Sequence, residues 1–272
     1  MTALVVPQDC LDGIDEMKPS RIYAMFSGGH DSLCSTHLAA TLPDFAGVVH
    51  CNTGIGIEAT RDYVRDTCER FDWPLHELHA DREYEDLVIE RGGFPSGPKS
   101  HNSMLFYLKE KPLRKFIQEV KEHRTDRIGL VTGIRKGESV RRMAAKISVP
   151  VKKDGVKIWI NPILDWSDRE KNAYMKEHDL PRNQVTDLLH RSGECLCGAL
   201  ARREELQGIL DWFPEEGQRI LNLEKRCKDE GLDEHFWAMR SRVSADQGEL
   251  FASPLCVGCA QNYDPEPEAE TA

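Results

Sequence analysis

The sequence predicts an α/β fold, in which helices cover both faces of a mostly parallel sheet and a smaller helical, cysteine-rich region follows. Three observations predict it. Apolar runs alternate with helix-like segments through the first two-thirds of the chain. A glycine-rich turn follows the first of these runs. Past Ser167 the pattern is helical and is interrupted by two pairs of cysteines.

Short apolar runs predict strands, and the longer segments between them predict helices. The expected strands are Arg21 to Phe26, Phe45 to Cys51, Leu75 to His79 and Arg127 to Gly133. The expected helices are Asp31 to Leu42, Ile57 to Phe71 and a region from about Asn102 to Arg124. The stretch Lys146 to Trp166, with Lys153-Asp154-Gly155 in its middle, predicts a hairpin.

Four parts are expected along the 272 residues. An extension covers 1–19, an α/β domain 20–190, a helical cysteine-rich region 191–263, and a disordered tail 264–272, where Pro, Glu and Ala predominate. The stretch Gly92 to His101 is too rich in Gly and Pro for regular structure, and is either a mobile lid or a long connection. Lys99 and His101 within it are candidate substrate contacts.

The segment Ser27-Gly28-Gly29-His30-Asp31-Ser32 connects a predicted strand to a predicted helix. Glycines let the backbone approach an anion closely, and the positive end of the helix dipole favours negative charge there. The two serines add hydroxyl donors. A ligand-free β-α turn would look similar, but the six residues together are more specific.

These six residues match the Ser-Gly-Gly-x-Asp-Ser signature of the PP-loop ATP pyrophosphatases. From here to about residue 200 the chain resembles their phosphoadenosine phosphosulfate (PAPS) reductase branch, which implies an adenine nucleotide α-hydrolase-like fold. The resemblance implies that Ser27, Gly28, Gly29, His30, Asp31 and Ser32 bind the nucleotide. His30 replaces the usual Lys, which removes a fixed positive charge unless a nearby basic residue supplies one.

A second segment, Cys51 to Gly56, follows the next predicted strand. It is similar to the Asp-Thr-Gly element of that branch with its downstream Glu-Thr, although Asn52 stands where Asp is usual. The resemblance assigns the nucleotide contacts Thr53, Gly54, Glu58 and Thr60. The alternative is a tight turn whose Asn and Gly residues serve turn geometry alone.

The third segment, Thr132 to Arg142, is similar to the branch's Gly-Ile-Arg element. It adds Gly133 and Arg135 to the nucleotide contacts. Arginines present forked donors to phosphate oxygens, and phosphoryl chemistry depends mainly on positioning and charge neutralisation. The catalytic set expected from the resemblance is therefore Asp31, Arg135, Arg141 and Arg142; the alternative is a solvated run of charge.

The chain has nine cysteines and no secretion signal, so metal ligation or redox chemistry explains a cluster better than disulfides do. Two close pairs can give four sulfur ligands to zinc or to a 4Fe-4S cluster. The expected ligands are Cys195, Cys197, Cys256 and Cys259, with Cys227 an alternative to one of them. A redox-active Cys256-Cys259 pair without metal is the other interpretation. Cys10, Cys34, Cys51 and Cys68 fit ordinary buried thiols.

The resemblance favours 4Fe-4S over zinc, because cluster-bearing sulfonucleotide reductases and DNA phosphorothioation ATP pyrophosphatases lie in this branch. The spacing departs from the reductases, which have adjacent cysteines and a Cys-x-x-Cys, whereas this chain has Cys-x-Cys first.

Composition excludes other classes. No run of about 18 apolar residues is present, so we expect no membrane span and a cytoplasmic protein. The net charge of −10 argues against a diffuse electrostatic grip on nucleic acid, but a local basic stretch runs from Arg135 to Lys157.

The functional expectation is an enzyme that cleaves the α,β-phosphate bond of ATP, with Mg²⁺ bridging the phosphates and Asp31 as its ligand or water-holding partner. This activates an acceptor for sulfur transfer, and the resemblance suggests DNA phosphorothioation, with a protein partner donating sulfur. One alternative is a PAPS or APS reductase with a non-standard thiol, because the reductases' carboxyl-terminal Glu-Cys-Gly-x-His element is absent. The other is a nucleotide- and cluster-binding subunit without turnover.

Overall fold

A computed structural model describes residues 5–136, 149–232 and 235–239 of the chain. Its centre is a six-stranded sheet in the order β3-β2-β1-β4-β6-β5. The strands are β1 (Arg21–Met25), β2 (Phe45–Asn52), β3 (Leu75–His79), β4 (Ile128–Val131), β5 (Val151–Asp154) and β6 (Lys157–Ile160). All neighbouring strands pair in parallel except β5, which pairs antiparallel with β6 at one edge.

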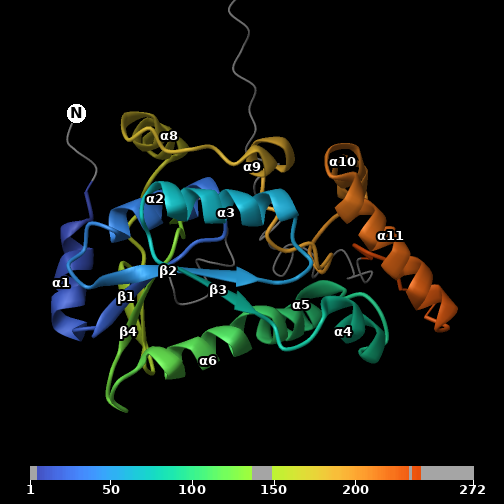
Figure 1. Ribbon diagram of the computed structural model, residues 1–272, viewed down its shortest axis with the longest axis horizontal. Helices are drawn as coiled ribbons and strands as arrows, with labels where there is room; N and C mark the ends of the chain where they lie inside the picture. Colours follow the sequence, from blue (N-terminus) through green and yellow to red (C-terminus); the bar gives the residue numbers. More distant parts are fainter. Residues whose placement is uncertain (1–4, 137–148, 233–234, 240–272) are drawn as a thin grey trace, which may run out of the picture.

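Helices cover both faces of this sheet, as the sequence predicts (Figure 1). One face carries α1 (Gln8–Met17), α2 (His30–Ala39), α3 (Glu58–Arg70) and α8 (Asp168–Glu177). The opposite face is covered by α6 (Lys111–Val120). Successive residues of β1 explain this arrangement, because Ile22 and Ala24 join the core under α2 while Tyr23 packs with Phe116 of α6.

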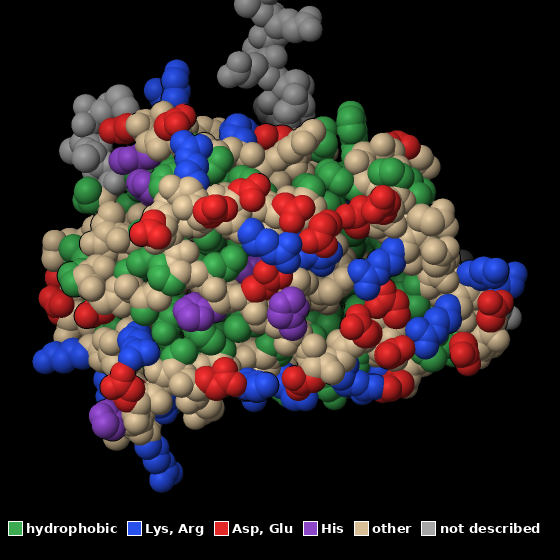
Figure 2. All heavy atoms as spheres, viewed as in Figure 1, with side chains coloured by type: hydrophobic (Ala, Val, Ile, Leu, Met, Phe, Trp, Pro, Cys, Tyr) green, Lys and Arg blue, Asp and Glu red, His purple; other side chains and the backbone are tan. Residues whose placement is uncertain are grey.

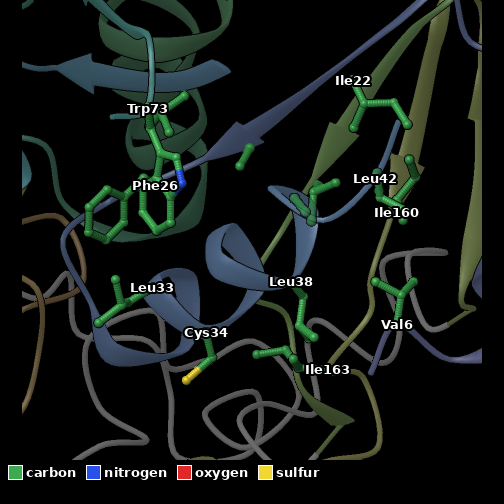
Figure 3. Close-up of a cluster of buried hydrophobic side chains, with 14 of the residues drawn as sticks. Val6, Ile22, Phe26, Leu33, Cys34, Leu38, Leu42, Trp73, Ile160 and Ile163 are labelled. Carbon is green, nitrogen blue, oxygen red and sulfur yellow. The ribbon is translucent and has the colours of Figure 1, made fainter. Parts of the chain in front are cut away.

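The largest core lies between the sheet and α1, α2 and α3. Figure 3 shows Leu33 on the side of Phe26, Leu38 beside Ile163, and Leu42 beside Ile160. Cys10, Cys34, Cys51 and Cys68 are all buried, and burial raises the pKa of each of these thiols to about 12. This confirms them as ordinary buried thiols.

The remaining elements form a second cluster beyond the ends of β1 and β2. They are α4 (Tyr84–Glu90), α5 (Gly97–Leu105), the π-helix η1 (Phe106–Glu110), α9 (Gln184–Leu189), α10 (Glu205–Trp212) and α11 (Pro214–Asp229). Trp237 is fully buried among them.

The expectation of irregular structure over Gly92 to His101 is wrong in its second half, because α5 already begins at Gly97. A proline is tolerated in the first turn of a helix, where its missing N–H would have no intrahelical acceptor. The hairpin expected around Lys153-Asp154-Gly155 is confirmed by the β5-β6 pair. In the described ranges, no helix is long and apolar enough to cross a membrane.

Candidate functional site

The candidate site lies where β1 and β4 end. The next strand in the chain, β2, lies on one side of β1, and the later strand β4 lies on the other side. The strand order therefore reverses between β1 and β4. Such a reversal opens a crevice at the carboxyl ends of the strands, where α/β sheets bind ligands. The segments that begin at Ser27, Asn52 and Gly133 all leave the sheet at this edge.

The glycine-rich segment after β1, residues 27–32, is here called the phosphate loop. Gly28 has a φ of +81°, and its carbonyl accepts a hydrogen bond from the Asn183 side chain at 2.8 Å. The Ser27 and Ser32 hydroxyl oxygens lie 3.1 Å apart, and Ser32 Oγ donates to the Gly29 carbonyl at 2.8 Å. The loop is thus preorganised by its own hydroxyls and by Asn183, the residue that caps α9.

His30 is buried and does not supply the cation that the usual Lys would. Its Nε2 accepts a hydrogen bond from the Asn183 backbone N–H at 3.3 Å. Burial, together with the nearby Arg182, lowers the pKa of His30 to about 4, although Asp187 opposes the shift. His30 is therefore neutral at pH 7 and fixes α9 against the loop.

Two other cations gather at the loop instead. Arg135 Nε lies 2.9 Å from Asp31 Oδ1, and Arg135 Nη2 lies 2.9 Å from Asp168 Oδ1. Lys171 of α8 lies 2.8 Å from Asp168 and 3.7 Å from Asp31. The Lys171 hydrogen bond and the Arg135 charge lower the pKa of Asp168. The result is a four-residue network that joins the ends of β4 and β1 to α8.

Gly133 allows β4 to end against the first turn of α2. A Cβ at this position would lie 2.6 Å from the Ser32 backbone nitrogen. The close approach expected of Gly133 is thus made to the helix that follows the phosphate loop.

The second predicted segment holds the loop that carries the first cysteine pair. Thr53 Oγ1 donates to the Glu194 carbonyl at 2.8 Å, and Thr60 Oγ1 donates to the Ser192 carbonyl. Gly54 N–H donates to the Asn52 side chain at 2.9 Å, which is the turn geometry expected of Asn. Glu58 is partly exposed and pairs with arginines of α3. Direct nucleotide contact by these four residues stays a prediction.

One cavity connects the phosphate loop with the cysteines. It has a volume of about 250 Å³, and Ser27, Arg191, Ser192, Cys195 and Cys197 line it. Apolar side chains of α5 and η1, together with Trp237, also line it. Hydrogen bonding with Cys197 lowers the pKa of Cys195 against the effect of burial, and Lys109 acts in the same direction.

Lys109 and Glu194 form an ion pair beside the cysteines. Burial alone would lower the pKa of Lys109, but the charge of the Glu194 carboxylate raises that pKa. Lys109 lies in the π-helix η1, a distortion that often accompanies functional sites. The Lys109 and Glu194 side chains neutralise each other's charge at this end of the cavity.

Several predicted site residues lie outside the described ranges: Arg141, Arg142, Cys256 and Cys259. Among the residues that are described, no group of three or more His, Cys, Asp or Glu side chains could hold a metal. Cys227 is buried in α11 and does not line the cavity, so it is not brought to Cys195 and Cys197 as the alternative ligand requires.

Sequence reasoning missed Lys171, Asp168, Lys109 and Arg191 as site residues. Asp168 and Lys171 are three apart at the start of a helix, a spacing that predicts an ion pair but no ligand. Arg191 stands close before Cys195, and that proximity was the available signal. His101 lines the cavity, in keeping with its place among the candidate substrate contacts.

Comparisons with known proteins find relatives of this chain. An uncharacterized protein of Methanocaldococcus jannaschii is 29% identical over 225 residues, which are 80% of this chain and 51% of the relative. The adenosine 5'-phosphosulfate reductase of Salinibacter ruber is 29% identical over 168 residues, 62% of this chain and 63% of that enzyme. The chain thus spans about half of the first relative and under two-thirds of the second.

Among solved structures, the PAPS reductase of Candida auris in its phosphate complex aligns with a TM-score of 0.49 and 20% identity, covering 68% of this chain and 85% of that one. The family model described as the phosphoadenosine phosphosulfate reductase domain matches residues 21–195. That range runs from β1 through the phosphate loop to Cys195. The chain therefore belongs to the PAPS reductase family, a branch of the PP-loop ATP pyrophosphatases.

Proposed function

We propose that this protein binds ATP at the phosphate loop and cleaves its α,β-phosphate bond to activate an acceptor for sulfur transfer. One observation carries the proposal: a single cavity is lined both by Ser27 of the phosphate loop and by the thiols of Cys195 and Cys197. A sulfur-handling group beside a phosphate cradle fits chemistry in which the acceptor oxygen is joined to AMP, leaves as part of AMP, and is replaced by sulfur.

The reaction needs positioning and positive charge rather than a protein nucleophile. The acceptor oxygen attacks the α-phosphorus, the bond to the bridging oxygen breaks, and pyrophosphate leaves with that electron pair. The phosphate-loop N–H groups and the α2 dipole bind the phosphates. Lys171 supplies the fixed cation that His30 does not, since it is 14% exposed and reaches Asp31.

The cysteine pair fits half of a four-sulfur site. Cys195 and Cys197 interact through their thiols in one cavity, so both can be ligands, and Cys256 and Cys259 are the proposed remainder. A 4Fe-4S cluster held there would supply iron that binds sulfur; zinc is the alternative.

The carboxylate of Asp31 does not fit the expected direct ligand of Mg²⁺. Arg135 and Lys171 already neutralise its oxygens. Mg²⁺ therefore belongs to the nucleotide substrate in this proposal, and Asp31 holds the two cations in place.

The acceptor in this proposal is a nucleic acid, most specifically the DNA backbone, and a protein partner donates the sulfur. The support is the basic stretch from Arg135 to Lys157, of which residues 137–148 lie outside the described ranges. The face over α3 is a poor candidate for this contact, because acidic side chains form a band across it (Figure 2).

Product identification tests the proposal. Metal-replete protein is incubated with α-labelled ATP, DNA as the acceptor and a source of sulfide, or with labelled PAPS, and the products are separated. AMP with pyrophosphate is the expected result. Sulfite from PAPS, with no ATP cleavage, would support a reductase that uses a non-standard thiol. The reductase stays the second candidate because the cavity holds two thiols and the family model is that of a PAPS reductase. Tight nucleotide binding without either product would support a non-catalytic subunit.

A further inference from the structure

Arg191 is the residue of the cavity whose role neither the fold nor the proposed reaction explains. It lies between α9 and the cysteine pair, and its side chain lines the cavity. Only 10% of that side chain is exposed, although a guanidinium is always charged. A buried charge of this kind needs partners for its donors.

The partners found for Arg191 are incomplete. Its Nη1 forms an ion pair with Glu205 of α10 at 2.5 Å. Its Nε is buried and has no hydrogen-bond acceptor among the described residues. A buried donor without an acceptor destabilises the folded protein, so this position is suited to an acceptor that arrives with a ligand.

The surroundings indicate an anionic ligand. The next residue, Ser192, lies against the phosphate loop: its Cβ would be 3.5 Å from a Cβ at Gly29. Ser27 lines the same cavity, and its hydroxyl is part of the loop's hydrogen-bond chain. Thr60 fixes the Ser192 carbonyl, so the backbone that carries Arg191 is held in place.

We propose that Arg191 and the phosphate loop together bind a tetrahedral oxyanion, a phosphate or sulfate group, in this cavity. The inference rests on the proposed use of the loop for phosphate and adds the residue that holds the far side of the anion. The guanidinium fork matches two oxygens of such a group. Glu205 competes with the anion for the same side chain and keeps the charge compensated while the cavity is empty of anion.

Calorimetric titration of the full chain tests this without turnover. The probes are inorganic phosphate, sulfate, pyrophosphate, AMP and ATP. Arg191→Gln is expected to weaken at least one of these anions by about 10-fold to 100-fold, the usual loss of a charge-assisted hydrogen bond. If only the affinity for inorganic phosphate or sulfate is reduced, the ligand is a free oxyanion. Loss confined to ATP and pyrophosphate identifies the phosphates of the nucleotide.

Two variants separate this role from a structural one. Arg226→Gln removes a guanidinium that pairs with Asp86 on α4, outside the cavity, and is expected to leave every affinity unchanged. Glu205→Gln breaks the same ion pair as Arg191→Gln but keeps the guanidinium, so it is expected to leave anion affinity equal or tighter. Thermal unfolding of each variant measures its folding.

Unchanged affinities in Arg191→Gln overturn the inference, and so does an equal loss in Glu205→Gln. A wild-type protein that binds none of the probes also overturns it. ATP cleavage that persists in Arg191→Gln with unchanged affinity for every probe removes this inference but leaves the proposed function. If anion binding depends on Arg191 but the protein shows no turnover, the inference stands and the proposed function does not.

Discussion

The guanidinium of Arg135 forms an ion pair with Asp31, its Nε lying 2.9 Å from Oδ1, and this contact connects the end of β4 to the start of α2. Arg135 is only 9% exposed. The contact crosses the crevice at which the strand order reverses. The two segments that bound the crevice are therefore held together by charge before any ligand binds.

Replacing Asp31 with Asn is expected to destabilise the fold by about 2 kcal/mol. Breaking a buried pair commonly costs about 3–5 kcal/mol, and Asp168 remains as a partner for Arg135 here. Urea unfolding measures the change in the free energy of unfolding. The control is Asp62→Asn, which breaks an exposed pair with Arg65 and should cost less than about 1 kcal/mol. Equal losses in the two variants would contradict a buried role for the Asp31 pair.

Lys171→Met is expected to weaken ATP binding by about 10-fold at low salt and to reduce its dependence on ionic strength. The reason is that Lys171 supplies the fixed cation at a loop whose histidine is neutral. Calorimetric titration at two salt concentrations measures both effects. Lys176→Met, on the exposed side of the same helix, is the matched control and should bind like the wild type. An unchanged affinity in Lys171→Met would leave Arg135 as the loop's cation.

Most of the fold could be predicted because local patterns determine it. The run of buried apolar residues in β1 and the glycines after it specify a strand, a turn and a helix. The start of α5 could not be predicted in this way. Gly97 begins a helix because tertiary packing places this segment against the cavity wall, which overrides its low helix propensity.

The candidate site was predicted as motifs but not as contacts. The sequence places Arg135 after a strand, yet its partners Asp31 and Asp168 come from segments far apart in the chain. The contacts of Thr53 and Thr60 with the nucleotide stay a prediction, and sequence reasoning did not show that their hydroxyls hold the carbonyls of Glu194 and Ser192. Which of two polar groups a hydroxyl reaches depends on the packing of both segments, and single-sequence reasoning does not supply it.

Stability should fall as the pH decreases from about 6.5 to 4, and His30 should contribute about 3 kcal/mol of that loss. Its pKa in the folded protein is about 4, below the ordinary value of 6.5, so the unfolded chain binds the proton first. The contribution is complete above pH 6.5 and disappears as the pH falls through 4. Urea unfolding of wild type and His30→Gln across this range measures it.

The free energy of unfolding should change less with pH in His30→Gln than in the wild type. His123→Gln, which removes an exposed histidine, is the control and should follow the wild-type curve. Parallel curves for His30→Gln and wild type would show that folding does not shift the pKa of His30 from its ordinary value of 6.5. In that case burial would not keep His30 neutral below that pH.

Cys195→Ser and Cys197→Ser should each reduce bound metal to a small fraction of the wild-type amount after anaerobic purification. Both thiols line the cavity, and a four-sulfur site does not tolerate the loss of one ligand without weakened binding. Iron, sulfide and zinc analysis measures the metal and identifies it. Cys227→Ser should keep full occupancy, since that thiol lies in α11 away from the cavity, although it will lower stability. Stoichiometric zinc without sulfide would exclude the cluster.

Gly28→Ala is expected to cost about 3 kcal/mol of stability and to abolish measurable ATP binding. Part of the cost, about 1–2 kcal/mol, comes from placing a side chain at a φ of +81°. The rest comes from the contact of the new Cβ with Thr60 Cγ2, which would be 2.6 Å away. Urea unfolding and calorimetric titration with ATP measure the two effects.

Two further variants separate these causes. Gly155→Ala, at a φ of +61° in the β5-β6 turn with no atom within 4 Å of the new Cβ, should show the backbone cost alone. Thr60→Ser in the Gly28→Ala background removes the Cγ2 methyl but keeps the hydroxyl that donates to the Ser192 carbonyl. It should recover the steric part of the stability, while ATP binding returns only if the loop regains its conformation. If Gly28→Ala loses no more stability than Gly155→Ala, the new Cβ meets no steric resistance from Thr60 of α3.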